Sequence, residues 1–258
     1  MTPAADSSPS TPTRPVTGLT AKQLSTFWRD GFLIIPSYLS EQEYTAALAK
    51  THDLLHNLDL SNHPMTKFTQ EHVGDDYFLS SGDQVRFFFE EDAFTASTGG
   101  ESRLCKPKEK AINKIGHNLH GLVDEFAQIS HRGALGARNA AVARDLGFRD
   151  ARLLQSMVIC KQPEIGGAVP PHQDSTFLYT DRPSAVGFWF ALQDATVKAG
   201  DLVLIHGNVL HKSERNVSDR GRMAYTFHLI EGEEHYDERN WLQVPGGPAA
   251  FTKLDGRG

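Results

Sequence analysis

The amino-acid sequence predicts an α+β fold, in which helices from the first part of the chain back a β-sandwich or jelly roll formed by the second part. Capping boxes and helical periodicity dominate before Gly147, and apolar strand-like runs separated by Gly and Pro dominate after Leu153. No internal repeat interrupts this order. A chain of 258 residues can bury a substantial core, and we expect one folded domain over residues 19–244.

Both ends of the chain are predicted to be tails. Residues 1–18 are rich in Pro, Ser and Thr and hold almost no large apolar side chains, so burial cannot offset the entropy of ordering them. A cleaved targeting peptide is the alternative for this segment, but Arg14 is its only basic residue. Residues 245–258 are expected to form a flexible C-terminal tail.

Two helices are predicted near the start by capping boxes, in which Ser or Thr is followed three residues later by Gln or Glu. These boxes are Thr20 with Gln23, and Ser40 with Glu43. The first helix should end near Gly31 and lead into a strand from Phe32 to Pro36. We interpret this pair of helices as scaffold.

The middle of the chain combines a predicted hairpin with further helices. Asp76 to Glu90 contains two apolar runs around Ser81-Gly82-Asp83, and its three consecutive Phe residues are expected in the core. Helical patterns cover Leu119 to Ile129 and Ala137 to Leu146, with Gly147 at a C-cap. The strands predicted afterwards are Leu153 to Lys161, Phe177 to Tyr179, Gly187 to Leu192, Asp201 to His206 and Met223 to Ile230.

Composition favours a protein that acts on a small molecule. The formal net charge of -6 gives no general attraction to nucleic acid or to acidic membrane surfaces, and no apolar stretch is long enough to span a membrane. Two cysteines, Cys105 and Cys160, are too few for a disulfide framework and indicate a reducing compartment. We therefore expect a cytoplasmic protein with a small-molecule substrate and with neither a nucleic-acid nor a membrane partner.

A candidate metal site lies at the ends of two apolar runs. His172 and Asp174 are two residues apart in an extended segment, so their side chains project from the same face. His211 follows another strand pattern and is the best third ligand. Two His and one carboxylate form the facial triad of non-haem Fe(II) oxygenases, which leaves three coordination positions open. With 12 His in the chain, a chance pattern is the alternative.

Several segments together resemble the phytanoyl-CoA dioxygenase family over roughly residues 19–243. They are NKIGHNLH at 113–120, QSMVICKQP at 155–163, HQDSTFLYT at 172–180, and LIHGNVLHKS with NVSDRGRMAYTFHL within 204–229. The resemblance implies a double-stranded β-helix, a cupin-like jelly roll. It further implies that His172, Asp174 and His211 hold Fe(2+), with 2-oxoglutarate and O2 as co-substrates.

The resemblance also implies a 2-oxoglutarate pocket. Arg222, 11 residues after His211, matches the family arginine for the far carboxylate, and a planar guanidinium suits that role. Lys114, Met157, Gln173, Trp189 and Ser213 fall on further family positions in this pocket. The alternatives are a solvated helix-end lysine for Lys114, core packing for Met157 and Trp189, and a turn for Ser213. We interpret His206 and His228 as structural.

The implied reaction is decarboxylation of 2-oxoglutarate to succinate and CO2, coupled to hydroxylation of an unidentified small molecule. An acyl-CoA is not predicted as the substrate, because no basic cluster is present to hold its phosphates. A cupin-like metalloprotein with Zn or Mn would leave Arg222 and Trp189 unexplained.

One departure from the family pattern lies near Val197. Family members carry several tens of residues between the equivalents of Thr196 and Gly200, so the barrel should lack about three central strands here. We expect Phe188, Trp189 and Phe190 to lose packing partners as a result. A shortened, catalytically impaired or silent family member is therefore the second hypothesis for function.

Overall fold

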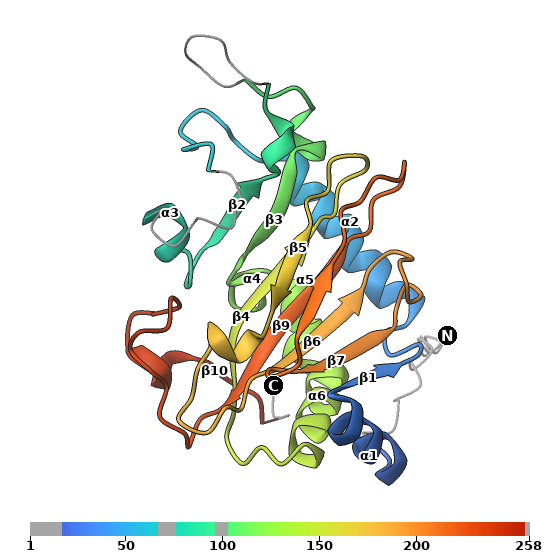
Figure 1. The fold of residues 1–258 in the computed structure, drawn as a ribbon, viewed down its shortest axis with the longest axis vertical. Helices are drawn as coiled ribbons and strands as arrows, with labels where there is room; N and C mark the ends of the chain where they lie inside the picture. The colour runs from blue at the N-terminus through green and yellow to red at the C-terminus, as the bar shows by residue number, and fades with distance from the viewer. Residues whose placement is uncertain (1–16, 67–75, 96–102, 256–258) are drawn as a thin grey trace, which may run out of the picture.

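A computed structural model describes residues 17–66, 76–95 and 103–255. Its architecture is α+β, as the sequence predicts: a large and a small antiparallel sheet, with helices on the outer face of the large one (Figure 1). Within these residues, no helix combines the length and the apolar character needed to cross a membrane.

The large sheet has its strands in the order β1-β7-β6-β9-β4-β3-β2, and β10 pairs with β4 outside this path. Every pair in it is antiparallel. The strands are β1 Phe32–Ile35, β2 Val85–Phe89, β3 Ile112–His117, β4 Ala151–Ile159, β6 Val186–Ala191, β7 Leu202–His206, β9 Ala224–Glu231 and β10 Thr252–Lys253.

The small sheet consists of β5 Val169–His172 and β8 His211–Ser213. These strands are antiparallel, and His172 lies directly opposite His211. Side chains that lie opposite each other in an antiparallel pair share a face, so the pairing brings these two imidazoles together. Figure 1 shows β5 in front of the large sheet and α2 behind it.

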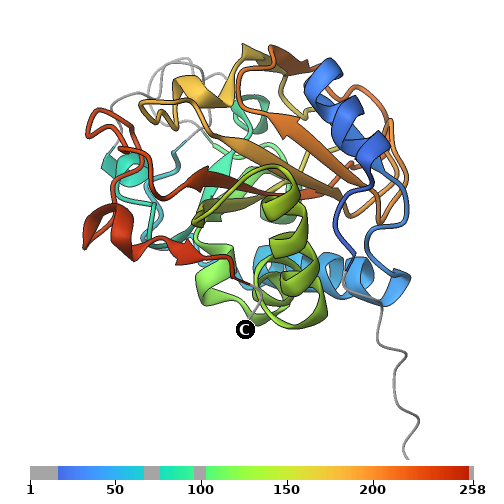
Figure 2. The same cartoon turned by 90° about the horizontal axis from the view of Figure 1, so that it is seen from below.

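Helices cover the other face of the large sheet, where Figure 2 shows α2, α5 and α6 together. The α-helices are α1 Ala21–Asp30, α2 Glu41–His56, α3 Asp76–Leu79, α4 Leu119–Leu122, α5 Asp124–Ser130 and α6 Gly133–Asp145. Short 3-10 turns are η1 Glu91–Ala93, η2 Lys108–Lys110, η3 Asp174–Thr176 and η4 Gly247–Ala250. Helix α1 lies apart from this layer, beside β1 (Figure 1).

The main core lies between the helices and the large sheet. Alternate side chains of the central strands β6 and β9 point toward the helices and are completely buried: Phe188, Phe190, Tyr225 and Phe227. The Tyr225 ring lies 4.7 Å from that of Phe126 on α5, and its hydroxyl is 2.5 Å from the Ser130 hydroxyl. Burying an aromatic side chain of this size contributes about 1.5–3 kcal/mol.

The helices predicted from capping boxes are confirmed. The Thr20 hydroxyl accepts a hydrogen bond from the Gln23 amide at 3.2 Å, and the Ser40 hydroxyl accepts one from the Glu43 amide at 3.4 Å. Helix α1 ends at Gly31, whose φ of 77° lies in the left-handed region that glycine adopts without strain.

Two predicted elements are wrong. In place of a hairpin over Asp76 to Glu90, residues 76–79 form the helical turn α3, and β2 pairs with the distant β3. No strand forms over Phe177 to Tyr179, because η3 turns the chain and the Phe177 amide donates to the Asp174 carbonyl. Strand β3 itself is not among the predicted strands, since its partners β2 and β4 are remote in sequence.

The two predicted tails have different outcomes. Residues 1–16, most of the N-terminal tail, lie outside the described residues. The prediction of a flexible C-terminal tail is wrong for residues 247–255. Strand β10 pairs with β4, and the neighbouring Phe251 and Leu254 are buried. Burial of these two apolar side chains stabilises the packing of this segment against the sheet.

A compact turn joins β6 directly to β7 at the position of the predicted shortening. The Gly200 amide donates to the Ala191 carbonyl, and the Gly200 carbonyl accepts from the Leu39 amide. The Asp201 carboxylate accepts from the amides of Ser37 and Lys198, each at 2.9 Å. Because β6 and β7 are hydrogen-bonded neighbours, the chain can connect them without further strands. Among the described residues the small sheet is left with β5 and β8 alone.

The expected loss of packing around this turn is wrong for Phe188 and Phe190, which are completely buried against the helix layer. Trp189 points to the opposite face of β6 and is partly exposed. Near the short connection, the completely buried rings therefore lie on the helix side of the sheet, and the partly exposed ring lies on the other side.

Candidate metal and 2-oxoglutarate site

Three predicted ligands meet where the small sheet faces the large one. His172 ends β5, Asp174 follows in η3, and His211 begins β8. Asp174 Oδ1 lies 3.5 Å from His172 Nε2 and 3.8 Å from His211 Nε2. One ligand atom from each residue lies within 4.8 Å of the others, which is a spacing that a single ion can bridge.

Hydrogen bonds to the backbone orient both imidazoles. His172 Nδ1 lies 2.9 Å from the Pro170 carbonyl, and His211 Nδ1 lies 3.0 Å from the Val209 carbonyl. A carbonyl can only accept, so each Nδ1 carries the hydrogen and each Nε2 is left to bind a metal. Two imidazole nitrogens and one carboxylate oxygen are the donor set of a facial-triad iron site, and the residues present fit Fe(II).

Asp174 is buried but remains ionised. Burial alone would raise the pKa of its carboxyl group, but the nearby His228 imidazole and the hydrogen bond with His172 outweigh burial and hold the pKa well below its usual value. The same hydrogen bond raises the pKa of His172. A proton therefore competes with a metal ion for His172 Nε2.

His228 and Gln155, which were not predicted as site residues, extend the contacts of Asp174. His228 Nε2 lies 3.4 Å from Asp174 Oδ2, and His228 Nδ1 lies 3.3 Å from the amide nitrogen of Gln155. The two-residue alternation along β9 could have identified His228, because it places this residue on the same face as Thr226 and Ala224, in line with Arg222. His228, predicted to be structural, therefore also contacts a candidate metal ligand.

Met157 and Trp189 lie on the face of the large sheet that meets the triad. Both pair with Thr226 of β9, one two-residue step along the strands from the row of Gln155, His228 and Gly187. Met157 is buried and Trp189 is partly exposed. The structure therefore places both predicted residues beside the candidate metal centre and not in the helix-side core.

Lys114 lies in β3, so the alternative of a solvated helix-end lysine is wrong. It pairs with Ile159, which places its side chain on the triad face, and its charge acts on His172. Burial lowers the pKa of Lys114 to about 7. An anion bound nearby would favour the charged form.

Arg222 lies beside a second cation at the far end of this face. Its amide donates to the Lys161 carbonyl, and within the described part of the chain its buried Nε atom has no hydrogen-bond partner. Burial and, to a smaller extent, the Arg222 charge lower the pKa of Lys161. A guanidinium whose buried Nε is an unused donor suits a carboxylate.

The two remaining predicted residues differ in placement. Ser213 lies in β8, opposite Val169, and not in a turn. Gln173 lies between two ligands on the extended segment, so its side chain points away from them, and its amide donates to the Asn208 carbonyl. The structure does not bring the Gln173 side chain to the other candidate residues.

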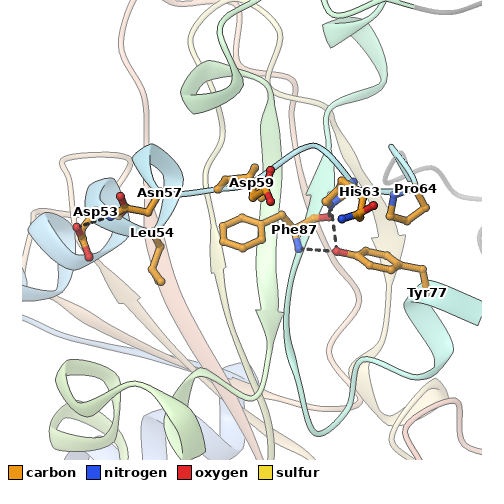
Figure 3. Close-up of a pocket in the computed structure, with 10 residues that line it drawn as sticks. Asp53, Leu54, Asn57, Asp59, His63, Pro64, Tyr77 and Phe87 are labelled. Atoms are coloured by element: carbon orange, nitrogen blue, oxygen red, sulfur yellow. Dashed lines mark hydrogen bonds between the residues drawn. The ribbon is translucent and has the colours of Figure 1, made fainter.

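A cavity of about 430 Å³ lies elsewhere, between α2, the segment that follows it, and β2 (Figure 3). Its lining includes Asp53, Asn57, His63, Tyr77 and Phe87. Phe87 and Phe88 point to opposite faces of β2, and Phe88 pairs with Lys114 on the triad face. The cavity is therefore separated from the candidate metal centre by the sheet.

Solved structures with the same architecture define the class of fold. The non-heme alpha-ketoglutarate-dependent epimerase SnoN from nogalamycin biosynthesis matches with a TM-score of 0.61 and 16% identity, over 90% of this chain and 97% of that one. EctD from S. alaskensis, solved with 2-oxoglutarate and 5-hydroxyectoine, matches with a TM-score of 0.59 and 16% identity, over 87% and 80%. The fold is the cupin-like jelly roll of non-haem oxygenases, as predicted.

Sequence comparison shows the family. The phytanoyl-CoA dioxygenase family model matches residues 27–198 and 195–224. Phytanoyl-CoA dioxygenase domain-containing protein 1 of Bos taurus is 37% identical over 284 residues, which cover 87% of this chain and 95% of the relative. The chain belongs to the phytanoyl-CoA dioxygenase family, whose fold is that of a dioxygenase-type enzyme.

The comparisons also locate the shortening. The two segments matched by the family model meet at residues 195–198, within the turn between β6 and β7. Since 87% of 258 residues is about 224 and the alignment with the bovine relative spans 284 positions, about 60 positions lack a residue of this chain.

Proposed function

We propose that this protein is an Fe(II)- and 2-oxoglutarate-dependent dioxygenase that hydroxylates a small molecule. The observation that carries the proposal is the convergence of His172, Asp174 and His211, with both imidazoles oriented by backbone carbonyls so that Nε2 is free to bind a metal. The family and the fold support the same activity.

Each residue has a role in this proposal. Bound iron, with 2-oxoglutarate and O2, would supply the oxidation, in which 2-oxoglutarate is converted to succinate and CO2 and the substrate gains a hydroxyl group. His172, Asp174 and His211 hold the metal and leave three positions open. Arg222 meets the far carboxylate of 2-oxoglutarate with two hydrogen bonds.

The other residues on this face complete the co-substrate pocket. Lys114 adds a second positive charge, and Ser213 is expected to add a hydroxyl donor. Met157 and Trp189 cover the co-substrate with apolar surface and exclude water, which strengthens its ion pairs. The assignment of Gln173 rests on the family position alone.

The test is anaerobic addition of Fe(II) and 2-oxoglutarate, with the weak visible charge-transfer band of their chelate as the signal. We expect the band in the wild-type protein and its loss in the His211→Ala variant. His206→Ala is the matched control, since the ring of His206 packs against Trp28 and makes no contact with Asp174. Absence of the band in wild-type protein that binds Fe(II) would contradict the proposal.

A shortened, catalytically impaired protein is the second candidate, and the two-stranded small sheet favours it. The two candidates differ in turnover and agree on binding. Formation of the charge-transfer band without succinate production in air would favour the impaired form, whereas succinate production would favour the active enzyme. A variant with a family-length segment inserted between Ala195 and Gly200 is the positive control. The cytoplasmic location stays a prediction.

A further inference from the structure

The two oxygens of the Asp174 carboxylate have different surroundings. Oδ1 faces the two candidate imidazole ligands, at 3.5 Å and 3.8 Å. Oδ2 faces a third imidazole, that of His228, at 3.4 Å. His228 does not belong to the group of residues that converge on one point. One carboxylate oxygen therefore faces the candidate metal ligands, and the other faces a residue of the large sheet.

The hydrogen bond of Gln155 fixes the direction of this contact. An amide nitrogen can only donate, so the Gln155 amide donates to His228 Nδ1 at 3.3 Å. A neutral imidazole that accepts at Nδ1 carries its hydrogen at Nε2, the ring atom that lies 3.4 Å from Asp174 Oδ2. The three side chains form a chain of donors that runs from Gln155 through His228 to the carboxylate.

Neighbouring strands of the large sheet hold Gln155 and His228 side by side and place Gly187 next to Asp174. Gln155, His228 and Gly187 lie in one row across β4, β9 and β6. A Cβ atom on Gly187 would be in van der Waals contact with both groups, at 3.5 Å from Asp174 Oδ2 and from His228 Nε2, so this row of the sheet lies directly against the contact between them. Within the described part of the chain, buried Gln155 Oε1 has no partner. The amide is thus oriented toward His228 although its oxygen is left unsatisfied.

The number of carboxylate oxygens on the metal decides how many positions stay open. A carboxylate with two equivalent oxygens can bind through both and occupy two positions. Chelation by 2-oxoglutarate takes two positions and O2 takes one, so all three open positions of a facial triad are needed. A donor on Oδ2 keeps the second oxygen away from the metal.

We propose that His228, oriented by Gln155, is a positioning residue that makes Asp174 a one-oxygen ligand. The inference rests on the proposed iron and 2-oxoglutarate site. It assigns to His228 the control of coordination number, and to Gln155 the control of the His228 tautomer.

The test compares His228→Leu, which removes the donor, with His228→Gln, whose amide nitrogen can take the place of Nε2. Co(II) is the first probe, because its visible absorption reports coordination number without 2-oxoglutarate or turnover. We expect an altered Co(II) spectrum in His228→Leu and a wild-type spectrum in His228→Gln. Identical spectra in wild type and His228→Leu would overturn the proposal, and this holds even if the protein proves not to bind 2-oxoglutarate.

The second readout is anaerobic binding of 2-oxoglutarate to the Fe(II) protein. His228→Leu should weaken it by about 10-fold while Fe(II) affinity changes less, and His228→Gln should restore it. Equal weakening of 2-oxoglutarate and Fe(II) binding in both variants would indicate a structural role only and would also overturn the proposal. If His228→Leu does not fold, Gln155→Met replaces it, with the same spectral change expected at smaller amplitude and an unchanged spectrum counting against the proposal.

Discussion

The two faces of the large sheet differ in how completely they are covered. On the helix side, Phe188 and Phe227 are completely buried, and their rings stack at 4.8 Å. On the other side, the neighbouring residues Gly187, Trp189 and His228 face the triad and the two-stranded small sheet. Alternate residues of the same strands thus have two roles: one set packs in the core beneath the helices, and the other set faces the candidate metal site. The helix side is therefore the more completely covered of the two faces.

The least covered part of the triad side is its edge. Phe32 and Ile34 of β1 are 44% and 43% exposed, and they pair with Ile205 and Val203 of β7, which are partly exposed. Paired residues share a face, so these four side chains form one apolar strip on the side opposite the helices. The helix-side core is therefore expected to carry most of the stability.

The largest expected effect compares two adjacent aromatic residues of β6 that point to opposite faces. Phe190→Ala removes a completely buried ring and should lower the free energy of unfolding by about 3–5 kcal/mol. Trp189→Ala removes a larger but partly exposed ring and should cost about half as much or less. Urea unfolding of both variants measures the difference. Equal losses would show that the triad side packs as tightly as the helix side.

The next effect concerns metal binding on the triad side. Asp174→Ala or His172→Ala removes one of three ligands and should weaken Fe(II) binding by more than about 100-fold, because removing a group that only hydrogen-bonds to a metal ligand can already reach that range. The helix-side core should keep both variants folded. Metal titration measures the loss, and circular dichroism checks the fold. Loss of iron in His206→Ala, with iron retained in His211→Ala, would show that the ligand assignment is wrong.

Local signals explain why the sequence predicts some of these features and not others. Capping boxes act within four residues, so α1 and α2 follow from the sequence. The spacing of His172 and Asp174 is equally local. Strand β3, by contrast, is defined by partners 23 to 45 residues away in the sequence. The predicted hairpin over residues 76–90 is wrong for the same reason, because β2 pairs with the remote β3.

The same limit applies within the site. Gln155 and His228 meet only because β4 and β9 pair, over 73 residues of separation. The burial of Phe188 and Phe190 likewise depends on which face of the sheet the helices cover. The three consecutive aromatic residues 188–190 do not by themselves indicate which face that is. The two-residue alternation along β9 gives a partial signal. It places His228 and Arg222 on the same face, so assigning either residue to the triad face also assigns the other.

A smaller effect should separate the metal from the co-substrate end of the triad side. Arg222→Lys keeps the charge but loses the paired hydrogen bonds to a carboxylate, so 2-oxoglutarate binding should weaken by about 10-fold while Fe(II) affinity is nearly unchanged. Anaerobic titration of 2-oxoglutarate, followed by the charge-transfer band, measures the change. Arg220→Lys is the matched control, since Arg220 is exposed. Equal affinity in the Arg222 variant and wild type would remove Arg222 from the co-substrate site.

A pH-dependent effect tests whether the triad side holds a charge at the expense of stability. Burial lowers the pKa of Lys114 to about 7, whereas the pKa of a lysine in an unfolded chain is near 10.4. Between these values the unfolded chain binds more protons than the folded one, so stability rises with pH. Below about pH 7 the full penalty of the buried charge is present, and it is lost as the pH approaches about 10.

Lys114→Met removes this group, so the variant should be more stable than wild type at about pH 7, and its advantage should shrink as the pH rises toward about 10. Urea unfolding of the metal-free proteins across this range measures the difference, with Lys110→Met, which replaces an exposed lysine, as the control. A difference independent of pH would mean that Lys114 keeps the same charge in both states. In that case, anionic groups on the triad face would already neutralise it, and its proposed role toward 2-oxoglutarate would lose its electrostatic basis.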